Sequence, residues 1–510
     1  MIDSLTTYFA VSGMELFLLA SILVIGLYAA WNIGANDVAN AMGTSVGSGA
    51  LTLKQAVILA GIFEFLGAVI VGSSVSETIR KKMFDPGQLT VIYGDNAAYV
   101  LACGMIASLL AAGTWLLVAT CKGWPVSTTH SIVGAVVGFG CVALGTDMVA
   151  WGAVGTITVG WIMSPILSGA IAYVVFTLIL KSVFFKRDPV KAAKRVAPWL
   201  VLIVLMVLCG VTAFKGLTPV WAKFGKKPFD SDVVLMTLAV ASVISIIGFF
   251  VTKRLLRNFD TRKASGVNPM LHTDVARSLG KAMMHLKRVR ANTDGELNGE
   301  SAKMLKQLES MHTQAVENTK YGTDSEELRR VEKIFVYLQI LTACFVAFAH
   351  GANDVANAIG PLSAGWQAVR TGTVTLNAGV PFWALSLGGI GIILGLATWG
   401  WRVIQTVGKR ITELTPSRGF CAEFAAALTI LLASVLALPV STTHTLVGAV
   451  LGVGAARGIG ALNLRTMRDI FASWAITIPA GALLSVVFFY VLKLIVFGNE
   501  NIVIMEAASQ

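Results

Sequence analysis

The stretch GANDVANA occurs twice in this chain, at residues 34–41 and 351–358, each time beside strongly apolar segments. Each copy places two asparagines and one aspartate in the apolar run: Asn36, Asp37 and Asn40, then Asn353, Asp354 and Asn357. Polar and charged groups at lipid depth are costly and usually serve binding or transport. The doubled octapeptide therefore predicts a membrane protein with a binding site.

The composition places the rest of the chain in a membrane as well. Of 510 residues, 55% are hydrophobic and only 13% are charged, which is too apolar for an ordinary soluble protein. Apolar stretches long enough, or nearly so, to cross a bilayer recur along the chain, and two shorter ones lie at 131–145 and 445–456. We expect an all-α integral membrane protein with about 12 transmembrane helices.

A second motif repeats in the same order as the first. PVSTTHSIVGAVVGFG at 125–140 and PVSTTHTLVGAVLGVG at 439–454 are identical at twelve of sixteen positions. PVSTTH begins 91 residues after GANDVANA in the first half and 88 residues after it in the second. This order and spacing indicate an internal duplication.

The duplication divides the chain into four parts. The first transport repeat is expected at 1–180 and the second at 334–510. Between them, 181–252 is expected to hold a basic cytoplasmic loop and two additional transmembrane helices, and 253–333 a charged cytoplasmic loop. Part of that charged loop is predicted to be helical, because apolar residues recur every three or four positions between Leu271 and Leu286.

The distribution of charge predicts the orientation. The net charge of +12 comes largely from loops, so it is a topological signal and not a sign of a nucleic-acid partner. Residues 181–197 hold six basic groups against one acid, and 253–333 hold sixteen against eleven. Both loops are therefore placed inside and both termini outside, although the basic clusters at 80–82 and 223–227 oppose this orientation. The two octapeptides would then run in opposite directions, as in inverted-topology repeats whose broken or re-entrant helices meet at a central site.

GANDVANA has the chemistry of a cation site. A hard monovalent ion needs several oxygen ligands, which a carboxylate, amides and unwound backbone carbonyls can supply. The alternative is that the small residues and asparagines only hold helices together. We place sodium at four residues: Asp37, Asn40, Asp354 and Asn357.

PVSTTH has the pattern of a helix start. Free backbone N–H groups, the positive end of the helix dipole and hydroxyl donors there can hold a tetrahedral oxyanion, although an ordinary N-cap has the same pattern. The predicted anion ligands are Ser127, Thr128, Thr129, Ser441, Thr442 and Thr443. His130 and His444 close the motifs and are expected to order the turn, in preference to binding the anion or relaying protons.

Two further carboxylates lie on apolar segments. Glu64 and Glu423 do not match each other in the repeats, and each is a candidate to complete a cation site, to carry a coupling proton or to pair with a buried group. His350 precedes the second octapeptide, but Ile33 holds that place in the first. We therefore do not assign His350 to a symmetric site.

The doubled motifs, together with AVILAGIFEFLGAV (56–69), VSETIRKK (75–82) and TPSRGFCAEFAAAL (415–428), closely resemble the inorganic phosphate transporter (Pit) family. The resemblance spans about 14–180 and 334–497. It implies an inverted-repeat fold with both termini outside, commonly a homodimer. It also implies phosphate at the two hydroxyl-rich helix starts and cations arranged by Asn36, Asp37, Asn40, Asn353, Asp354 and Asn357, with Glu64 and Glu423 at the family's acidic positions.

The predicted function is import of inorganic phosphate by symport with a cation. Sodium is favoured over the proton, because Asn36 and Asn353 stand where proton-coupled members of the family often vary the motif. Proton-coupled symport of phosphate or metal-phosphate and a phosphate-permeable channel are the alternatives. Arsenate, nearly isosteric with phosphate, should compete.

No enzymatic activity and no resident cofactor are expected. A hydrolase using Ser127 or Ser441 with the adjacent histidine would need an oriented base and an oxyanion site, and a duplicated motif suits a transport pathway better. The expected location is the plasma membrane, specifically a bacterial inner membrane.

Overall fold

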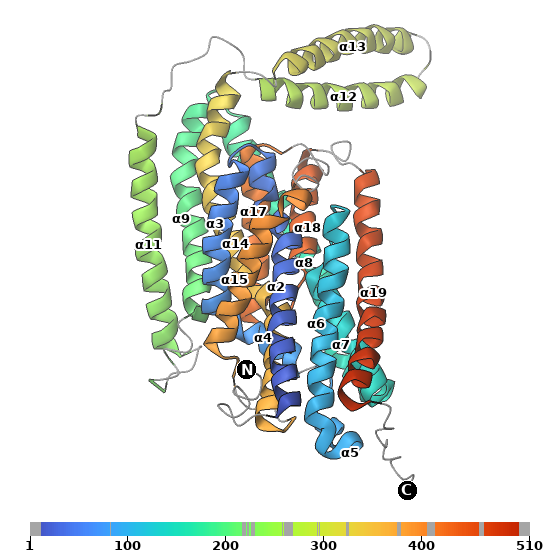
Figure 1. Cartoon of the computed structure of the whole chain (residues 1–510). Coiled ribbons are helices and arrows are strands. Elements are labelled where there is room, and N and C mark those ends of the chain that lie inside the picture. Colours follow the sequence, from blue (N-terminus) through green and yellow to red (C-terminus); the bar gives the residue numbers. More distant parts are fainter. Residues whose placement is uncertain are drawn as a thin grey trace.

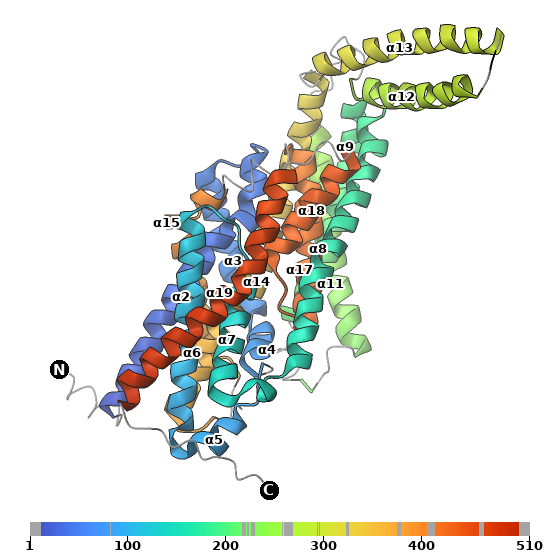
Figure 2. The same cartoon turned by 90° about the vertical axis from the view of Figure 1, so that its right-hand side faces the viewer.

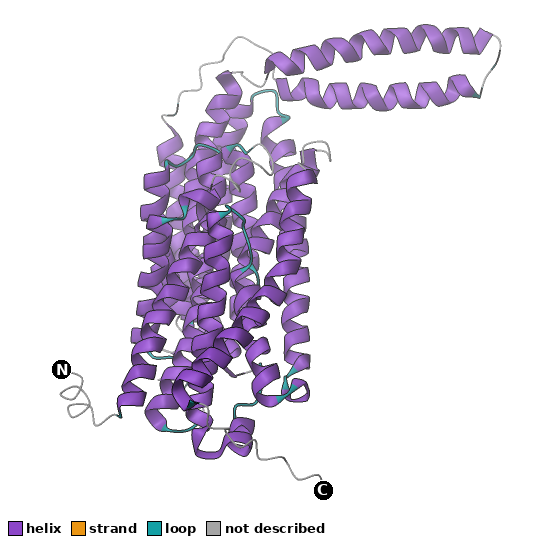
Figure 3. Ribbon diagram, turned by 45° about the vertical axis from the view of Figure 1, so that its right-hand side comes forward, coloured by secondary structure: helices purple, strands orange, loops and turns teal. Residues whose placement is uncertain are grey.

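The computed structural model describes residues 12–498, apart from 82, 217–220, 222–223, 226–229, 258, 260–268, 293, 295, 323–325, 375–378, 405–413 and 458–463. The regular elements in this part of the chain are helices (Figure 3). The all-α fold class is therefore confirmed.

Both repeated motifs of the first half involve helices: GANDVANA lies within one helix, and PVSTTH leads into another. The described helices of this half are α2 (Gly13–Gly47), α3 (Leu53–Val71), α4 (Ser73–Lys81), α5 (Gly87–Tyr93), η1 (Gly94–Asn96), α6 (Ala97–Cys121), α7 (Thr128–Leu144), η2 (Thr146–Met148), α8 (Trp151–Ile179) and η3 (Leu180–Phe184). Local sequence sets some of these starts. Ser12 with Glu15, and Thr52 with Gln55, form capping boxes that satisfy backbone N–H groups where α2 and α3 begin.

The connecting region and the second half follow. They consist of α9 (Pro189–Gly216), α11 (Ser231–Arg257), α12 (Pro269–Ala291), α13 (Glu296–Gly322), α14 (Glu326–Thr371), α15 (Phe382–Thr398), α17 (Pro416–Val435), α18 (Thr442–Arg457) and α19 (Leu464–Phe497). The helix predicted between Leu271 and Leu286 is confirmed as part of α12. The side chains of its residues 269–277 lie outside the described residues.

Nine helices in the described part of the chain are long and apolar enough to cross a membrane. Two shorter apolar helices, Thr128–Leu144 and Phe382–Thr398, add to them. The count of about twelve spans stays a prediction, as does the division of the chain into repeats at 1–180 and 334–510.

The arrangement of the helices supports the inverted-repeat interpretation. In Figure 1, α2 rises toward the end of the bundle that carries α12 and α13, whereas α14 descends away from it. The start of α2 and the end of α19 lie at the opposite end of the bundle from the α12–α13 hairpin (Figures 1 and 2). Whether that end faces outside stays a prediction.

Matching helices pack in matching ways. In the first half α2 packs against α6, and α6 against α7; in the second half α14 packs against α17, and α17 against α18. Across the halves, α2 packs against α15 and α14 against α3. The short breaks before α7 and α18 also correspond, because Gly123 (φ 66°) and Ala437 (φ 54°) both adopt the left-handed conformation.

Glycines allow the closest helix contacts between the halves. A Cβ atom on Gly34 would collide with the carbonyl oxygen of Ile392 in α15, and one on Gly351 would collide with the carbonyl oxygen of Glu64 in α3. The first glycine of each GANDVANA is therefore a place where two backbones meet.

We predict that Gly351→Ala destabilises the protein, because a backbone carbonyl cannot move aside as a flexible side chain can. Overpacking of this kind costs about 1–3 kcal/mol, so the melting temperature of the detergent-solubilised protein should fall by several degrees. Gly152→Ala is the control, because a Cβ atom there meets nothing within 4 Å. Equal melting temperatures for the two variants would contradict the close contact.

Candidate functional site

Both octapeptides lie inside uninterrupted helices, GANDVANA 34–41 in α2 and 351–358 in α14. The expectation that they contribute unwound backbone carbonyls is therefore wrong. A helix satisfies its own carbonyls, so only side chains of the octapeptides can bind a ligand. These side chains are fully buried, with Asp37 and Asp354 both at 0% exposure.

The breaks in the helices come instead at the start of each PVSTTH. Residues 122–127 separate α6 from α7, and residues 436–441 separate α17 from α18. Ser127 Oγ accepts a hydrogen bond from the N–H of His130 at 3.2 Å, and Ser441 Oγ accepts one from the N–H of His444 at 3.2 Å. The predicted helix starts are thus confirmed, and both serines cap them.

Each octapeptide contacts the PVSTTH of the other half. Asn40 Nδ2 in α2 donates to Thr443 Oγ1 at 2.8 Å. Asn357 Nδ2 in α14 donates to Thr128 Oγ1 at 3.1 Å and to Thr129 Oγ1 at 3.3 Å. These crossed bonds bring the two motif types together at one place in the interior of the bundle.

The helix starts also contact each other. Thr129 Oγ1 donates to the carbonyl of Val440, and Thr443 Oγ1 donates to the carbonyl of Val126, both at 3.0 Å. The two breaks therefore support one another across the molecule. Such paired contacts let buried, non-helical backbone satisfy its polar groups.

The carboxylates bind the hydroxyls of their own half. Thr128 Oγ1 donates to Asp37 Oδ2 at 2.8 Å, and Thr442 Oγ1 donates to Asp354 Oδ2 at 2.7 Å. Asn40 Nδ2 adds a bond to Asp37 Oδ1 at 3.0 Å. The predicted anion ligands and the predicted cation ligands are thus direct neighbours.

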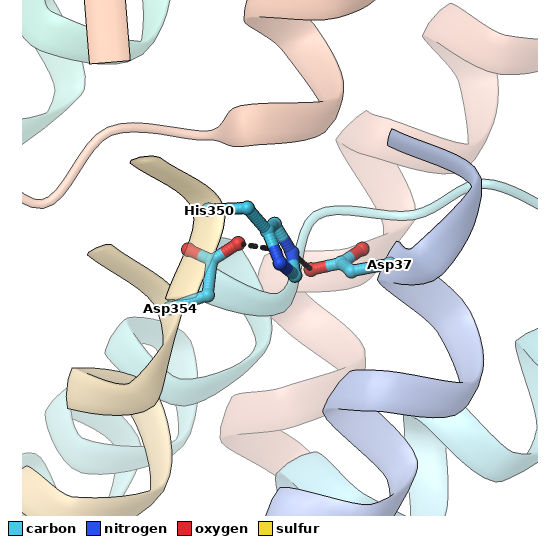
Figure 4. Close-up of side chains that lie close together, drawn as sticks. All are labelled: Asp37, His350 and Asp354. Carbon is cyan, nitrogen blue, oxygen red and sulfur yellow. Dashed lines mark ion pairs between the residues drawn. The ribbon is translucent and has the colours of Figure 1, made fainter. Parts of the chain in front are cut away.

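His350 lies between the two aspartates (Figure 4). Its Nε2 is 2.9 Å from Asp354 Oδ2 and 3.6 Å from Asp37 Oδ2, and its Nδ1 is 3.1 Å from Glu64 Oε1. The side chain is 0% exposed. A protonated imidazole would offset one of three ionised carboxylates and leave two negative charges.

The sequence alone does not assign His350 to the site, because Ile33 holds the corresponding position before the first octapeptide. The available signal was its spacing, because a residue four positions before Asp354 shares its helix face. Ligand atoms of Asp37, His350 and Asp354 all lie within 4.8 Å of one another, a geometry that could hold a cation.

Glu64 and Glu423 lie in different surroundings. Glu64 joins the central cluster through His350. Glu423 belongs to a separate cluster, where its Oε1 accepts from Thr44 Oγ1 and Ser45 Oγ at 2.6 Å and its Oε2 accepts from Thr342 Oγ1 at 2.8 Å. Gln339 Nε2 adds a bond to Oε1 at 3.1 Å. Glu423 is thus surrounded by neutral oxygen and amide groups drawn from α2 and α14.

Asn36 and Asn353 form hydrogen bonds at or beside the breaks that precede α7 and α18. Asn36 Nδ2 donates to Thr120 Oγ1 at 3.0 Å and to the carbonyl of Trp124 at 3.1 Å, and its Oδ1 accepts from the N–H of Val126. Asn353 Nδ2 donates to Ser434 Oγ at 3.2 Å in the second half. These contacts position the backbone before each PVSTTH. A cation-binding role for the two asparagines stays a prediction.

The two histidines of PVSTTH pack against each other and against tryptophans. The rings of His130 and His444 have centroids 4.4 Å apart, that of His130 is 3.9 Å from Trp161, and that of His444 is 3.5 Å from Trp474. These ring contacts support the expected ordering role.

Comparison with known proteins gives a family for the chain. The sequence profile of the phosphate transporter family matches residues 33–485. A protein of Chlamydia pneumoniae named as a candidate phosphate permease is 44% identical over 476 residues, covering 93% of this chain and 98% of its own. Inorganic phosphate transporter 2-1, a chloroplastic protein of Arabidopsis thaliana, is 41% identical over 92% of this chain and 71% of its own.

A solved structure resembles this one over most of its length. It is described as the sodium-dependent phosphate transporter, with a TM-score of 0.74 and 36% sequence identity, and the match covers 94% of this chain and 100% of that one. The two chains therefore share a fold and a recognisably similar sequence over most of their lengths.

We predict that Asn36→Ala lowers the melting temperature with and without sodium, because leaving buried acceptors unpaired costs about 1–3 kcal/mol. Asn32→Ala is the matched control one turn earlier, since Asn32 Nδ2 bonds only the carbonyl of Tyr28 in its own helix at 3.0 Å. A difference between the two variants that exists only in sodium would instead make Asn36 a cation ligand.

Proposed function

Because this chain belongs to the phosphate transporter family, we propose that it imports inorganic phosphate by symport with a cation, and that the cation is sodium. Family membership makes the chain a multi-pass membrane transporter and not an enzyme. The finer proposal, sodium symport, is supported by one observation above all. Each Asn/Asp octapeptide is hydrogen-bonded to the hydroxyl-rich helix start of the other half.

Phosphate is proposed to bind at the two helix starts. The backbone N–H groups and hydroxyls at these positions are neutral donors, and a helix N-terminus attracts anions. Neutral donors can release the anion, as a transporter requires, whereas charged lysine side chains in a site without water would hold it too tightly. The proposed ligands are Ser127, Thr128, Thr129, Ser441, Thr442 and Thr443.

Sodium is proposed to bind beside phosphate, at Asp37, Asn40, Asp354 and Asn357. Phosphate cannot approach two ionised carboxylates without a cation between them, because like charges at short range repel strongly in a low-dielectric interior. A sodium ion there would offset the negative charge of the carboxylates and would itself attract the phosphate anion. Glu64 adjoins this cluster through His350.

The threonines couple the two ligands. A hydroxyl has one proton to donate, and Thr128 and Thr442 now give theirs to the aspartates. When sodium occupies a carboxylate oxygen, the hydroxyl proton becomes available to phosphate, while its oxygen can face the cation. Sodium then raises the affinity for phosphate, and by linkage phosphate raises the affinity for sodium to the same degree.

Glu423 is proposed as a further cation position. Its oxygens already gather three hydroxyls and one amide in a buried pocket, and oxygen ligands of this kind suit a hard cation. The cluster lies on the part of α2 between the central site and the end that faces α12. A cation could therefore pass through it on the way to or from the centre.

A proton is the alternative coupling ion, and His350 favours it. An imidazole in contact with three carboxylates can take up and release a proton in the middle of the site. Arsenate is expected to compete with phosphate under either mechanism. The homodimer and the bacterial inner membrane stay predictions.

Phosphate uptake into proteoliposomes tests the function. We expect an inward sodium gradient to drive accumulation of phosphate above its external concentration, and choline in place of sodium to abolish it. Sodium and pH gradients are imposed separately. Accumulation driven only by the pH gradient would replace sodium with the proton, and equilibration without accumulation under every gradient would indicate a channel.

We predict that Asp354→Asn raises the sodium concentration for half-maximal uptake by at least about tenfold, because hydrogen bonds and ion contacts to a charged group contribute about 1.5–3 kcal/mol. The amide keeps the size of the side chain, so folding should change less than transport. Asp95→Asn is the control, since Asp95 is exposed in η1. Unchanged sodium dependence in Asp354→Asn would remove this aspartate from the cation site.

A further inference from the structure

The helices α12 and α13 form a hairpin that lies across the end of the bundle. Its helices run roughly perpendicular to the membrane-spanning helices, with α12 nearer the bundle and α13 beyond it (Figures 1 and 3). In Figure 2 the hairpin extends past α9 and α11. Its outer part therefore overhangs the region where lipid surrounds the protein.

One face of α12 is occupied by α13. His285, Leu286 and Val289 of α12 share a cavity with Leu308 and Met311 of α13. These contacts account for the apolar residues on that side of α12. Gly280 and Lys287 border α13 on its other flank, because a Cβ atom on Gly280 would lie 3.8 Å from His312 Nε2 and Lys287 Nζ is 4.0 Å from Glu309 Oε1.

The side of α12 centred on Met284 combines an apolar centre with cations on both edges. At 100° per residue, Gly280, Met284 and Ala291 fall along its middle, with Lys281 and Arg288 on one edge and Lys287 on the other. Met284 is 51% exposed. We call this set of six residues the α12 basic face. A hollow of about 450 Å³ on this side is lined by Gly280, Met283, Met284, Lys287, Arg288 and Ala291.

The charge on this part of α12 has a single sign. Between residues 278 and 291 the charged residues are Lys281, Lys287, Arg288 and Arg290, and there is no acid. Lys287 has one distant partner, Glu309 of α13 at 4.0 Å, with both side chains at least half exposed. Such exposed pairs contribute little, so the positive charge of the face is largely uncompensated.

We propose that the α12 basic face binds anionic phospholipid at the membrane surface. An interfacial helix places apolar side chains at the boundary of the acyl chains and basic side chains among the headgroups. Met284 fits the first position, and Lys281, Lys287 and Arg288 fit the second. The hollow over Gly280 gives a lipid phosphate access to the helix between the cations.

Lipid fits this face better than a soluble acidic protein does. The axis of α12 lies across the end of the bundle, roughly perpendicular to the membrane-spanning helices, as a helix at a membrane surface would lie (Figure 1). Surface attraction between basic residues and anionic lipid falls off within a Debye length. Only cations close to the membrane surface would gain from it, and α12 lies at the end of the membrane-spanning helices (Figure 1).

Hydrogen exchange of the full-length protein in nanodiscs tests the proposal. The nanodiscs contain either phosphatidylcholine alone or phosphatidylcholine with phosphatidylglycerol. We expect peptides covering 278–291 to exchange several-fold more slowly with phosphatidylglycerol, since each basic residue at the surface contributes about a fivefold change in binding. High salt should cancel the difference.

Two double variants with equal loss of charge separate this face from a general charge effect. Lys287→Gln with Arg288→Gln should remove most of the lipid-dependent slowing in α12. Lys303→Gln with Lys306→Gln should retain it, because these exposed lysines lie on the side of α13 away from α12. Equal exchange in the two lipids, an equal loss in both variants, or slowing that requires an added soluble protein would overturn the proposal.

Discussion

The structure depends on the burial of two carboxylates, Asp37 and Asp354, at the centre of a bundle built for lipid. A carboxylate without partners is very costly in such surroundings. Its partners among the described residues are threonine hydroxyls, asparagine amides and the His350 imidazole. Because Asp37 of the first half also contacts Thr443 and His350 of the second half, the need to stabilise the aspartates also constrains how the halves pack together.

This arrangement gives a physical basis for coupling. The groups that stabilise the carboxylates in the present structure are the same groups that a bound anion would need as donors. In the mechanism that we propose, a cation at the aspartates would release them, and binding of the two ligands would be linked through shared hydrogen bonds and not through a distant conformational signal. Caps by Ser127 and Ser441, and the edge-to-face contact of the His130 and His444 rings, support both helix starts.

The site is symmetric in its duplicated motifs and asymmetric around them. The contact of Gly351 with Glu64 corresponds to the contact of Gly34 with Ile392, so an isoleucine stands where the other half has a carboxylate. Ile33 likewise occupies the sequence position in the first repeat that His350 occupies in the second. In the inverted-repeat mechanism that we propose, the repeats would exchange roles as the transporter changes the side it faces. These unmatched titratable residues would then make the two directions chemically different.

The sequence by itself determined the membrane class, the duplication, the helix starts at PVSTTH and the polar residues of the candidate site. These follow from local pattern, because apolar length, repeated motifs and capping chemistry are properties of short segments. Only the tertiary structure decided that GANDVANA stays helical and that Asn40 bonds Thr443, which lies 403 residues further along the chain. It also decided that His350 contacts Asp37 and Glu64, and that Glu423 lies in a separate cluster. Such contacts arise from the packing of distant helices, and the spacing of residues along the chain does not encode which buried groups will share one pocket.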